Sequence, residues 1–170
     1  DPAAQFARFA AVAAKTPAWR IPDATKIKAE SRAGATFTTL PDGSLLVSGG
    51  KREAETTTLT IPLDLPSLTG LRLEAIPDPS LPGGGAGRAD DGAFVVSEFS
   101  VSVAPATRPG ESKPVTLHRP QADYARADLP VAQAADNDGS NPVMGWGVAP
   151  RQGEPHWAVF EVKDKLEFKE

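Results

Sequence analysis

The sequence contains no cysteine, few aromatic residues and no excess of positive charge. Without cysteine, these residues can form no disulfide, no thiolate zinc site and no covalent attachment to c-type haem. The formal net charge of -4 gives no general attraction to nucleic acid or to anionic membranes. No apolar run approaches the length that spans a bilayer. We therefore expect neither a nucleic-acid partner nor a membrane span.

Residues 1–18 have the pattern of an amphipathic helix. Phe6, Phe9 and Ala13 fall at positions i, i+3 and i+7, and the abundant alanine favours helix. The helix should end before Pro17, because a residue before proline is pushed out of the helical region. We expect a linker helix over 1–18 and one β-domain over 19–170. The first residues lack a signal-sequence pattern, so any export signal has been removed or lies outside this sequence.

Most of the remaining chain alternates apolar and polar residues, which indicates half-buried antiparallel strands. Turn residues separate these segments at intervals typical of a β-sandwich. The predicted strands are 35–40, 44–48, 56–62, 71–76, 93–103, 115–118 and 157–162. Pro41-Asp42-Gly43 favours a hairpin between the first two. The sequence therefore predicts a mainly β protein, an antiparallel β-sandwich of the jelly-roll type, preceded by one N-terminal helix.

The alternation also predicts which side chains form the core and where pairing stops. The core between two sheets should contain Leu71, Leu73, Val101, Val103, Phe160 and Val162. Residues 163–170 begin another alternation and then stop. We expect the chain to end inside or just before its final strands, which would leave an unpaired sheet edge near Leu166–Phe168.

Catalysis has little support. The two histidines are far apart in sequence, and no glycine-x-serine-x-glycine motif is present. Glu74 and Glu98 would form the carboxylate pair of a glycosidase or lyase only if their strands were neighbours. Structural ion pairs, Arg72 with Glu74 or Arg88 with Glu98, are the simpler interpretation. We therefore expect a protein that is not an enzyme.

The segment 135–141 is rich in oxygen-bearing side chains within a tight turn. Calcium prefers carboxylate and backbone carbonyl oxygens, so Asp136 and Asp138 are the candidate ligands of a structural calcium ion. The EF-hand spacing is absent. The alternative is a surface turn in which the same side chains bond to their own backbone.

Flat aromatic rings stack on the C–H faces of sugars, which makes an outward tryptophan a candidate ligand platform. In 157–162, the face with Ala158, Phe160 and Val162 should be buried, so Trp157 should point outward. The alternative is that Trp157 packs under the N-terminal helix. The glycine- and proline-rich loop that follows residue 76 adds Arg88 and Asp91 as candidate hydrogen-bond partners for hydroxyl groups.

Several segments resemble a known domain. They are Gly70–Phe99, Trp19, Asp42–Ser44, Ala122–Tyr124, Ala135–Trp146 and Pro155–Glu161. Together they are similar to the β-sandwich domain of large exported planctomycete-type multidomain cytochrome c proteins. The segment from Ala135 to Trp146 also resembles a short motif of galactose-binding-like, discoidin-type jelly rolls, in which that turn can hold calcium.

The first resemblance implies an extracytoplasmic location, periplasmic, cell-surface or secreted, and neighbouring domains that include c-type cytochromes. On this basis we expect a non-catalytic carbohydrate-binding module that targets attached domains to polysaccharide. The rival hypothesis is a structural interaction domain that packs against cytochrome or other neighbouring domains without a ligand of its own. An exposed aromatic platform favours the first hypothesis, and an exposed apolar patch favours the second.

Overall fold

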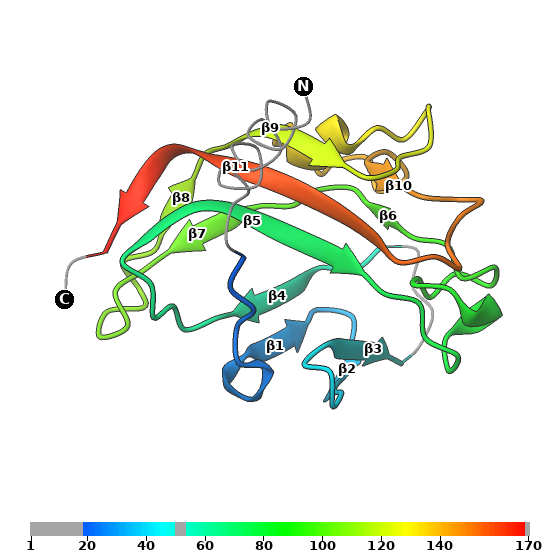
Figure 1. Ribbon diagram of the computed structural model, residues 1–170, viewed down its shortest axis with the longest axis horizontal. Helices are drawn as coiled ribbons and strands as arrows, with labels where there is room; N and C mark the ends of the chain where they lie inside the picture. Colours follow the sequence, from blue (N-terminus) through cyan, green and yellow to red (C-terminus); the bar gives the residue numbers. More distant parts are fainter. Residues whose placement is uncertain (1–18, 50–53, 169–170) are drawn as a thin grey trace, which may run out of the picture.

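The structure, a computed structural model, describes residues 19–49 and 54–168. Its strands are β1 (Lys28–Ser31), β2 (Thr36–Thr39), β3 (Leu45–Ser48), β4 (Thr57–Thr60), β5 (Ser67–Ala75), β6 (Val95–Val96), β7 (Val101–Val103), β8 (Lys113–Val115), β9 (Leu117–Ala122), β10 (Trp146–Gly147) and β11 (His156–Glu167). The short 3-10 helices are η1 (Ala24–Lys26), η2 (Pro82–Gly84) and η3 (Val131–Ala135). Figure 1 shows their arrangement. The predicted linker helix over 1–18 lies outside the described residues.

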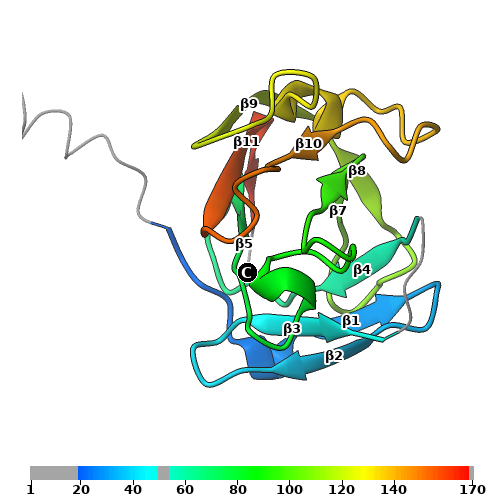
Figure 2. The ribbon, with the colours of Figure 1, turned by 90° about the vertical axis from the view of Figure 1, so that its right-hand side faces the viewer.

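All strand pairs in the described residues are antiparallel, which confirms the mainly β prediction. The largest sheet has the order β5-β11-β9, and the two-stranded sheets are β1-β4, β2-β3, β6-β10 and β7-β8. Figure 2 shows these sheets around a common interior, with β5, β11 and β9 on one side and β1 to β4 across one end. The joining of such small sheets into a jelly roll stays a prediction. No helix in the described part of the chain is long and apolar enough to cross a membrane.

The central strand of the largest sheet is β11, which runs for 12 residues. It pairs with β5 from His156 opposite Ala75 to Glu167 opposite Ser67, with a register shift after Glu161. On its other edge it pairs with β9, where Ala158 lies opposite Ala122. Because its residues 156, 158, 160 and 162 are buried and those between them are half-buried, β11 has one core face and one outer face.

The core gathers on the inner face of β11. Ala134, Trp146, Val148, Ala158 and Phe160 have no exposed surface. The ring of Phe99 stacks on Phe160 with centroids 4.6 Å apart, and Phe94 meets Trp146 edge to face at 5.3 Å. The indole Nε1 of Trp146 donates to the Tyr124 carbonyl at 2.9 Å, so the buried N–H is satisfied.

The hairpin predicted at Pro41-Asp42-Gly43 is present between β2 and β3. Gly43 has a φ of +84°, which glycine adopts without strain. The Leu40 N–H donates to the Ser44 carbonyl at 2.9 Å, and the Asp42 carboxylate accepts from the Ser44 N–H at 2.9 Å. The turn chemistry of the sequence therefore produces the predicted local structure.

Some predictions of strand and core position are wrong or only partly correct. The predicted strand 93–103 is broken, because 97–100 lie between β6 and β7 without ladder pairing. The edge expected near Leu166–Phe168 is paired on one side, since Leu166 lies opposite Leu68 and the Phe168 N–H donates to the Pro66 carbonyl.

Of the predicted core residues, Phe160 and Val162 are buried. The other four are half-buried, namely Leu71, Leu73, Val101 and Val103.

Phe160→Ala should lower the free energy of unfolding by about 3–5 kcal/mol, because it removes a fully buried ring and leaves a cavity beneath Phe99. Urea denaturation measures the loss. Val143→Ala is the control, since Val143 is 67% exposed and its truncation should change stability by no more than about 0.5 kcal/mol. Equal losses in the two variants would contradict this assignment of the core.

Candidate functional site

The outer face of the β5-β11-β9 sheet carries the tryptophan expected to bind a ligand. Trp157 alternates with buried Ala158 and is itself half-buried, so its ring lies on the outer side of the sheet. Its cross-strand partner on β5 is Glu74, and the next outward residue of β11, Val159, lies between Arg72 on β5 and Gln121 on β9. An aromatic ring thus lies beside polar side chains on the outer face of the sheet.

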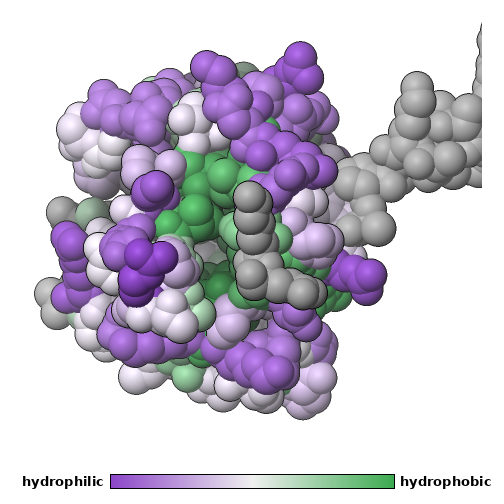
Figure 3. Space-filling view, turned by 90° about the vertical axis from the view of Figure 1, so that its left-hand side faces the viewer, coloured by the Kyte–Doolittle hydropathy of each residue, from purple (hydrophilic) through white to green (hydrophobic). Residues whose placement is uncertain are grey.

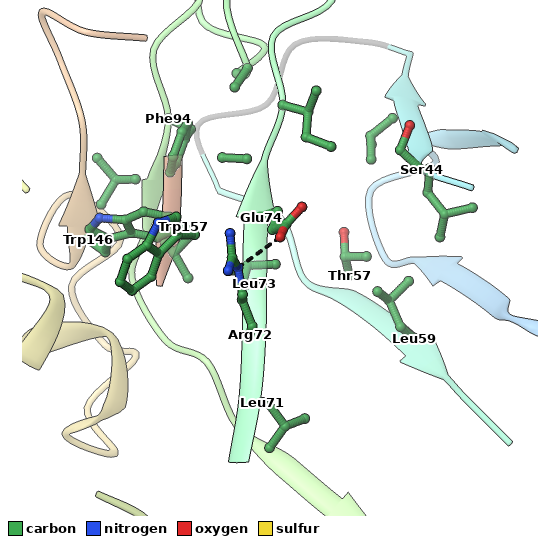
Figure 4. Close-up of a pocket in the computed structure, with 18 of the residues that line it drawn as sticks. Ser44, Thr57, Leu59, Leu71, Arg72, Leu73, Glu74, Phe94, Trp146 and Trp157 are labelled. Carbon is green, nitrogen blue, oxygen red and sulfur yellow. Dashed lines mark ion pairs between the residues drawn. The ribbon is translucent and has the colours of Figure 1, made fainter. Parts of the chain in front are cut away.

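Arg72 and Glu74 form one polar group beside Trp157 (Figure 4). The Arg72 Nε lies 2.8 Å from the Glu74 Oε1, so the predicted structural ion pair is present. The guanidinium carbon of Arg72 lies 5.1 Å from the centroid of the Trp157 ring, within range of a cation–π interaction. The pair therefore fixes charged donors and acceptors next to the aromatic surface.

A second tryptophan lies against the same sheet. Trp19 is 37% exposed, and a Cβ added to Gly70 would lie 3.9 Å from its Cη2 atom. The Trp19 ring therefore lies within van der Waals reach of the sheet at Gly70. Gly70 and Glu74 are four residues apart on β5, or about 13 Å at the rise of an extended strand. Trp19 lies beside Gly70 at one end of this stretch of β5, and Trp157 lies opposite Glu74 at the other end.

The backbone of Trp157 is anchored by Asp123, which also contacts the buried ring of His156. The Asp123 Oδ1 accepts from the Trp157 N–H at 2.8 Å, and the Asp123 Oδ2 lies 2.8 Å from the Nδ1 of His156, which is 3% exposed. The Nε2 of the same ring lies 3.0 Å from the Arg151 carbonyl. The Asp123 carboxylate and the Arg151 carbonyl thus hold the buried ring at both of its nitrogens.

Partial burial opposes ionisation of Asp123, but hydrogen bonds from the Trp157 N–H and from His156 outweigh it and lower the pKa of Asp123. Sequence reasoning missed this pair because the two residues are 33 positions apart.

Arg88, a predicted ligand residue, is held by a structural ion pair. Its guanidinium contacts the carboxylate of Glu55, whose side chain is only 8% exposed. The Ser31 hydroxyl donates to the same carboxylate. The sequence suggested Glu98 as the ion-pair partner of Arg88, and the structure shows Glu55 in that role. Arg88 therefore connects the glycine-rich loop to the segment between β3 and β4.

Asp91 bonds to its own loop and to Gln152, which precedes β11. Its Oδ1 accepts from the Ala93 N–H at 3.0 Å, and its carbonyl accepts from the Gln152 side chain at 3.1 Å. Two stretches of this loop lie against each other, because the Gly87 N–H donates to the Gly92 carbonyl at 2.8 Å. A Cβ on Gly87 would overlap the Ala93 carbonyl, so the loop needs glycine for close packing of backbone.

Asp136 and Asp138, the predicted calcium ligands, bond to their own turn. The Asp136 Oδ1 accepts from the Asp138 N–H at 2.9 Å, and the Asp138 Oδ1 accepts from the N–H and hydroxyl of Ser140. The Ser140 bonds lower the pKa of Asp138. Burial is the main cause that raises the pKa of nearby Glu98, and the negative charge of Asp136 is the second. Among the described residues, no three His, Asp or Glu side chains are grouped to hold a metal. Calcium binding stays a prediction.

Glu74 and Glu98, the two carboxylates considered for catalysis, lie in different parts of the fold. Glu74 is on β5 and pairs with Arg72. Glu98 lies between β6 and β7, and one of its carboxylate oxygens is buried without a hydrogen bond. The only strand paired with β5 in the described residues is β11, so the condition that the two strands be neighbours is not met.

A large hollow lies between β5 and the strands β3, β4 and β6, with a volume of about 2400 Å³. Figure 3 shows a hollow with hydrophobic side chains inside and hydrophilic ones around it. Every exposed large hydrophobic residue of the described chain lines this space, namely Trp19, Ile21, Leu59, Leu63, Ile76, Val95 and Val143. Trp157, Arg72 and Glu74 also line it, so the hollow extends to the ion pair beside this tryptophan. Arg88 lines it too, whereas Asp91 does not. Little in the sequence predicts this hollow, because its lining comes from distant segments.

A scan against protein-family models found no match. Searches of curated proteins and of solved structures also found none. The resemblance to the planctomycete-type cytochrome c proteins therefore stays a prediction.

Asp123→Asn should remove stability that the wild-type protein has only when Asp123 is ionised. The folded-state pKa of Asp123 is lowered, so its contribution is complete above the unfolded pKa of about 3.9 and is lost as the pH falls through the lower folded value. The difference in free energy of unfolding between wild type and variant should therefore shrink in acid. Urea titrations at a series of pH values measure it, and a difference that is constant down to the acid end would contradict the assignment.

Proposed function

We propose that this protein is a non-catalytic carbohydrate-binding module that binds a polysaccharide on the outer face of the β5-β11-β9 sheet. The observation that carries the proposal is the half-buried ring of Trp157 on that face, with the Arg72–Glu74 ion pair beside it. A sugar C–H face would stack on the exposed part of the ring, while the guanidinium donates to hydroxyl groups and the carboxylate accepts from them.

The spacing of the two tryptophans along β5 favours an extended glycan over a single sugar. Trp19 lies near Gly70, about 13 Å along β5 from the level of Trp157, and Glu161 lies opposite Gly70 on β11. A chain of linked sugars could contact both indoles and the polar residues between them. The ion pair with buried Glu55 makes Arg88 less suitable than Arg72 as a donor, so the proposal depends on Trp157 and does not require Arg88 or Asp91.

The wider parts of the proposal come from the sequence resemblance. They are a jelly-roll connectivity, an extracytoplasmic location, and neighbouring domains that include c-type cytochromes. In such a protein, this module would hold attached redox or hydrolytic domains at a polysaccharide surface. The absence of a shared partner strand for Glu74 and Glu98 favours binding over glycosidase or lyase chemistry.

Trp157→Ala should weaken binding to the glycan selected on an array at least tenfold, about 1.4 kcal/mol, because it removes the stacking surface. Isothermal titration calorimetry measures the change. Trp157→Phe is the matched control, since it keeps a smaller aromatic face and should retain most of the affinity. Melting curves must show that both variants fold. Unchanged affinity in folded Trp157→Ala would reject this platform.

A second candidate function is an interaction domain, and the hollow is the observation that favours it. Its volume of about 2400 Å³ exceeds the roughly 300–1,000 Å³ typical of small-ligand pockets. The exposed large hydrophobic residues gather in this hollow, and a contiguous apolar surface of this kind is usually covered by a partner. A neighbouring domain of the same polypeptide is the occupant that the sequence resemblance favours.

The hollow should make the native protein bind the dye ANS, which well-packed folded proteins do not do. Leu63→Ser and Ile76→Ser change side chains that are each 43% exposed and line the hollow, so they should reduce ANS fluorescence. Arg108→Ser, on the β7–β8 turn, is the control. No ANS enhancement with the wild-type protein would reject the second candidate.

A further inference from the structure

The strand β5 presents a backbone edge, as well as side chains, to the large hollow. Among the described residues it pairs with β11 alone, and all nine of its residues line the hollow. A strand that borders a space with one face contributes alternate residues to the lining, whereas a strand that borders it with an edge contributes consecutive ones. The uncovered edge of β5 therefore lies beside the hollow.

The strand β3 also has an uncovered edge at this space. Within 19–49 and 54–168 it pairs only with β2, and the consecutive residues Leu45, Leu46 and Val47 line the hollow. In an antiparallel ladder, alternate backbone groups point to opposite edges of a strand, so about half of those of β5 and of β3 point away from their partners. The walls of the hollow thus offer backbone donors and acceptors in addition to apolar side chains.

The volume of the hollow suits one extended segment. In a sheet, a residue takes about 3.4 Å along the strand, about 4.8 Å between strands and about 10 Å between packed layers, which is about 160 Å³. Nine residues, the length of β5, then take about 1,500 Å³ of the roughly 2400 Å³ in the hollow. One added strand therefore needs less space than the hollow holds, so β1 to β4 can stay in place. The hollow opens to the surface in Figure 3, and Figure 4 shows Ser44, Thr57 and Leu59 across it from β5.

The side chains of β5 specify the chemistry of such a segment. Leu71, Leu73 and Ala75 share a face with the buried residues of β11, while Arg72 and Glu74 are on the outer face. Directly opposed residues of antiparallel strands share a face and interact. A complementary segment is therefore apolar opposite the first three residues, basic opposite Glu74 and acidic opposite Arg72. From its N-terminus it alternates apolar, basic, apolar, acidic and apolar residues.

Only one antiparallel register satisfies this pattern. A shift of two residues places the basic residue opposite Arg72 or the acidic residue opposite Glu74, and like charges directly opposed are destabilising. A shift of one residue turns the charged side chains to the inward face. The antiparallel direction is favoured because it is the more stable ladder per residue, and because every strand pair of the described residues has it.

We propose that the hollow takes one extended polypeptide segment of this alternating kind, which pairs antiparallel with the uncovered edge of β5. The largest sheet then has the order β9-β11-β5-partner. The apolar side chains of the partner face the apolar lining, which includes Leu59 and Phe94. The inference rests on the second candidate function and deepens it, because it names the part of a partner that enters the hollow. That part is a single strand, since a folded domain is too large.

Fluorescence anisotropy with a labelled peptide tests the proposal. The probe is Thr-Val-Lys-Val-Glu-Val-Thr, held at nanomolar concentration so that it does not pair with itself. It should bind the wild-type protein and displace ANS. A second peptide with lysine in place of the glutamate should bind at least tenfold more weakly, because this lysine lies opposite Arg72. Arg72→Glu should reverse the preference, so that the second peptide binds more tightly.

A matched control separates the strand contact from a general effect of charge. Lys165→Glu makes the same change of net charge on β11, at an exposed side chain that does not line the hollow. This variant should keep the wild-type preference for the first peptide. Melting curves must show that each variant folds.

Backbone pairing has its own readout, which needs no protein variant. Alternate N–H groups of an added strand point to β5 and the others point away. Methylation of the three valine nitrogens and methylation of the lysine and glutamate nitrogens should therefore differ at least tenfold in their effect on affinity. Hydrogen exchange should show new protection of alternate amides within Ser67–Ala75 when the first peptide binds.

Equal affinity of the wild-type protein for the two peptides would overturn the proposal, as would equal losses from the two patterns of methylation. ANS fluorescence without any peptide binding would also overturn it, while the second candidate function would stand. The absence of both signals would reject the strand and the second candidate function together.

Discussion

The alternation of side chains along β11 is the constraint on which the rest of this structure depends. One face of the strand contributes His156, Ala158, Phe160 and Val162 to the interior. The other face carries Trp157 and the half-buried residues between them. Because β11 is the middle strand of β5-β11-β9, its alternation also sets which residues of its neighbours face inward. A shift by one residue would exchange core and surface along the whole sheet.

The same strand connects the core to the candidate ligand site. Asp123, which follows β9, accepts from the Trp157 N–H and contacts His156, so it fixes the start of β11 against β9. Two adjacent residues thus have different roles. The His156 side chain is buried and links β11 to the Arg151 carbonyl, whereas the Trp157 side chain faces outward beside Arg72. The position of the outer aromatic surface is therefore determined by bonds beneath it.

Local patterns predicted most of the individual strands, because alternation and turn chemistry depend on neighbouring residues. The β2–β3 hairpin and the inward-facing side chains of β11 are examples. The pairing of β5 with β11 could not be predicted in this way, since Ala75 and His156 are far apart in sequence. For the same reason the sequence paired Arg88 with nearby Glu98, and the structure pairs it with Glu55. The outward position of Trp157 was predictable from the alternation in 157–162, but its neighbour Arg72 depends on a strand partner that is distant in sequence.

The central claim is that the two faces of this sheet have separate roles, with a ligand on the outer face and packing on the inner one. An amide correlation NMR spectrum recorded during a glycan titration tests it directly, because the three tryptophans give three indole N–H signals. The Trp157 indole and the amides of Val159 and Glu161 should shift. The Trp146 indole, which is fully buried and bonded to the Tyr124 carbonyl, should not shift. Shifts that centre on Trp146, or none at Trp157 when the glycan binds, would contradict the account.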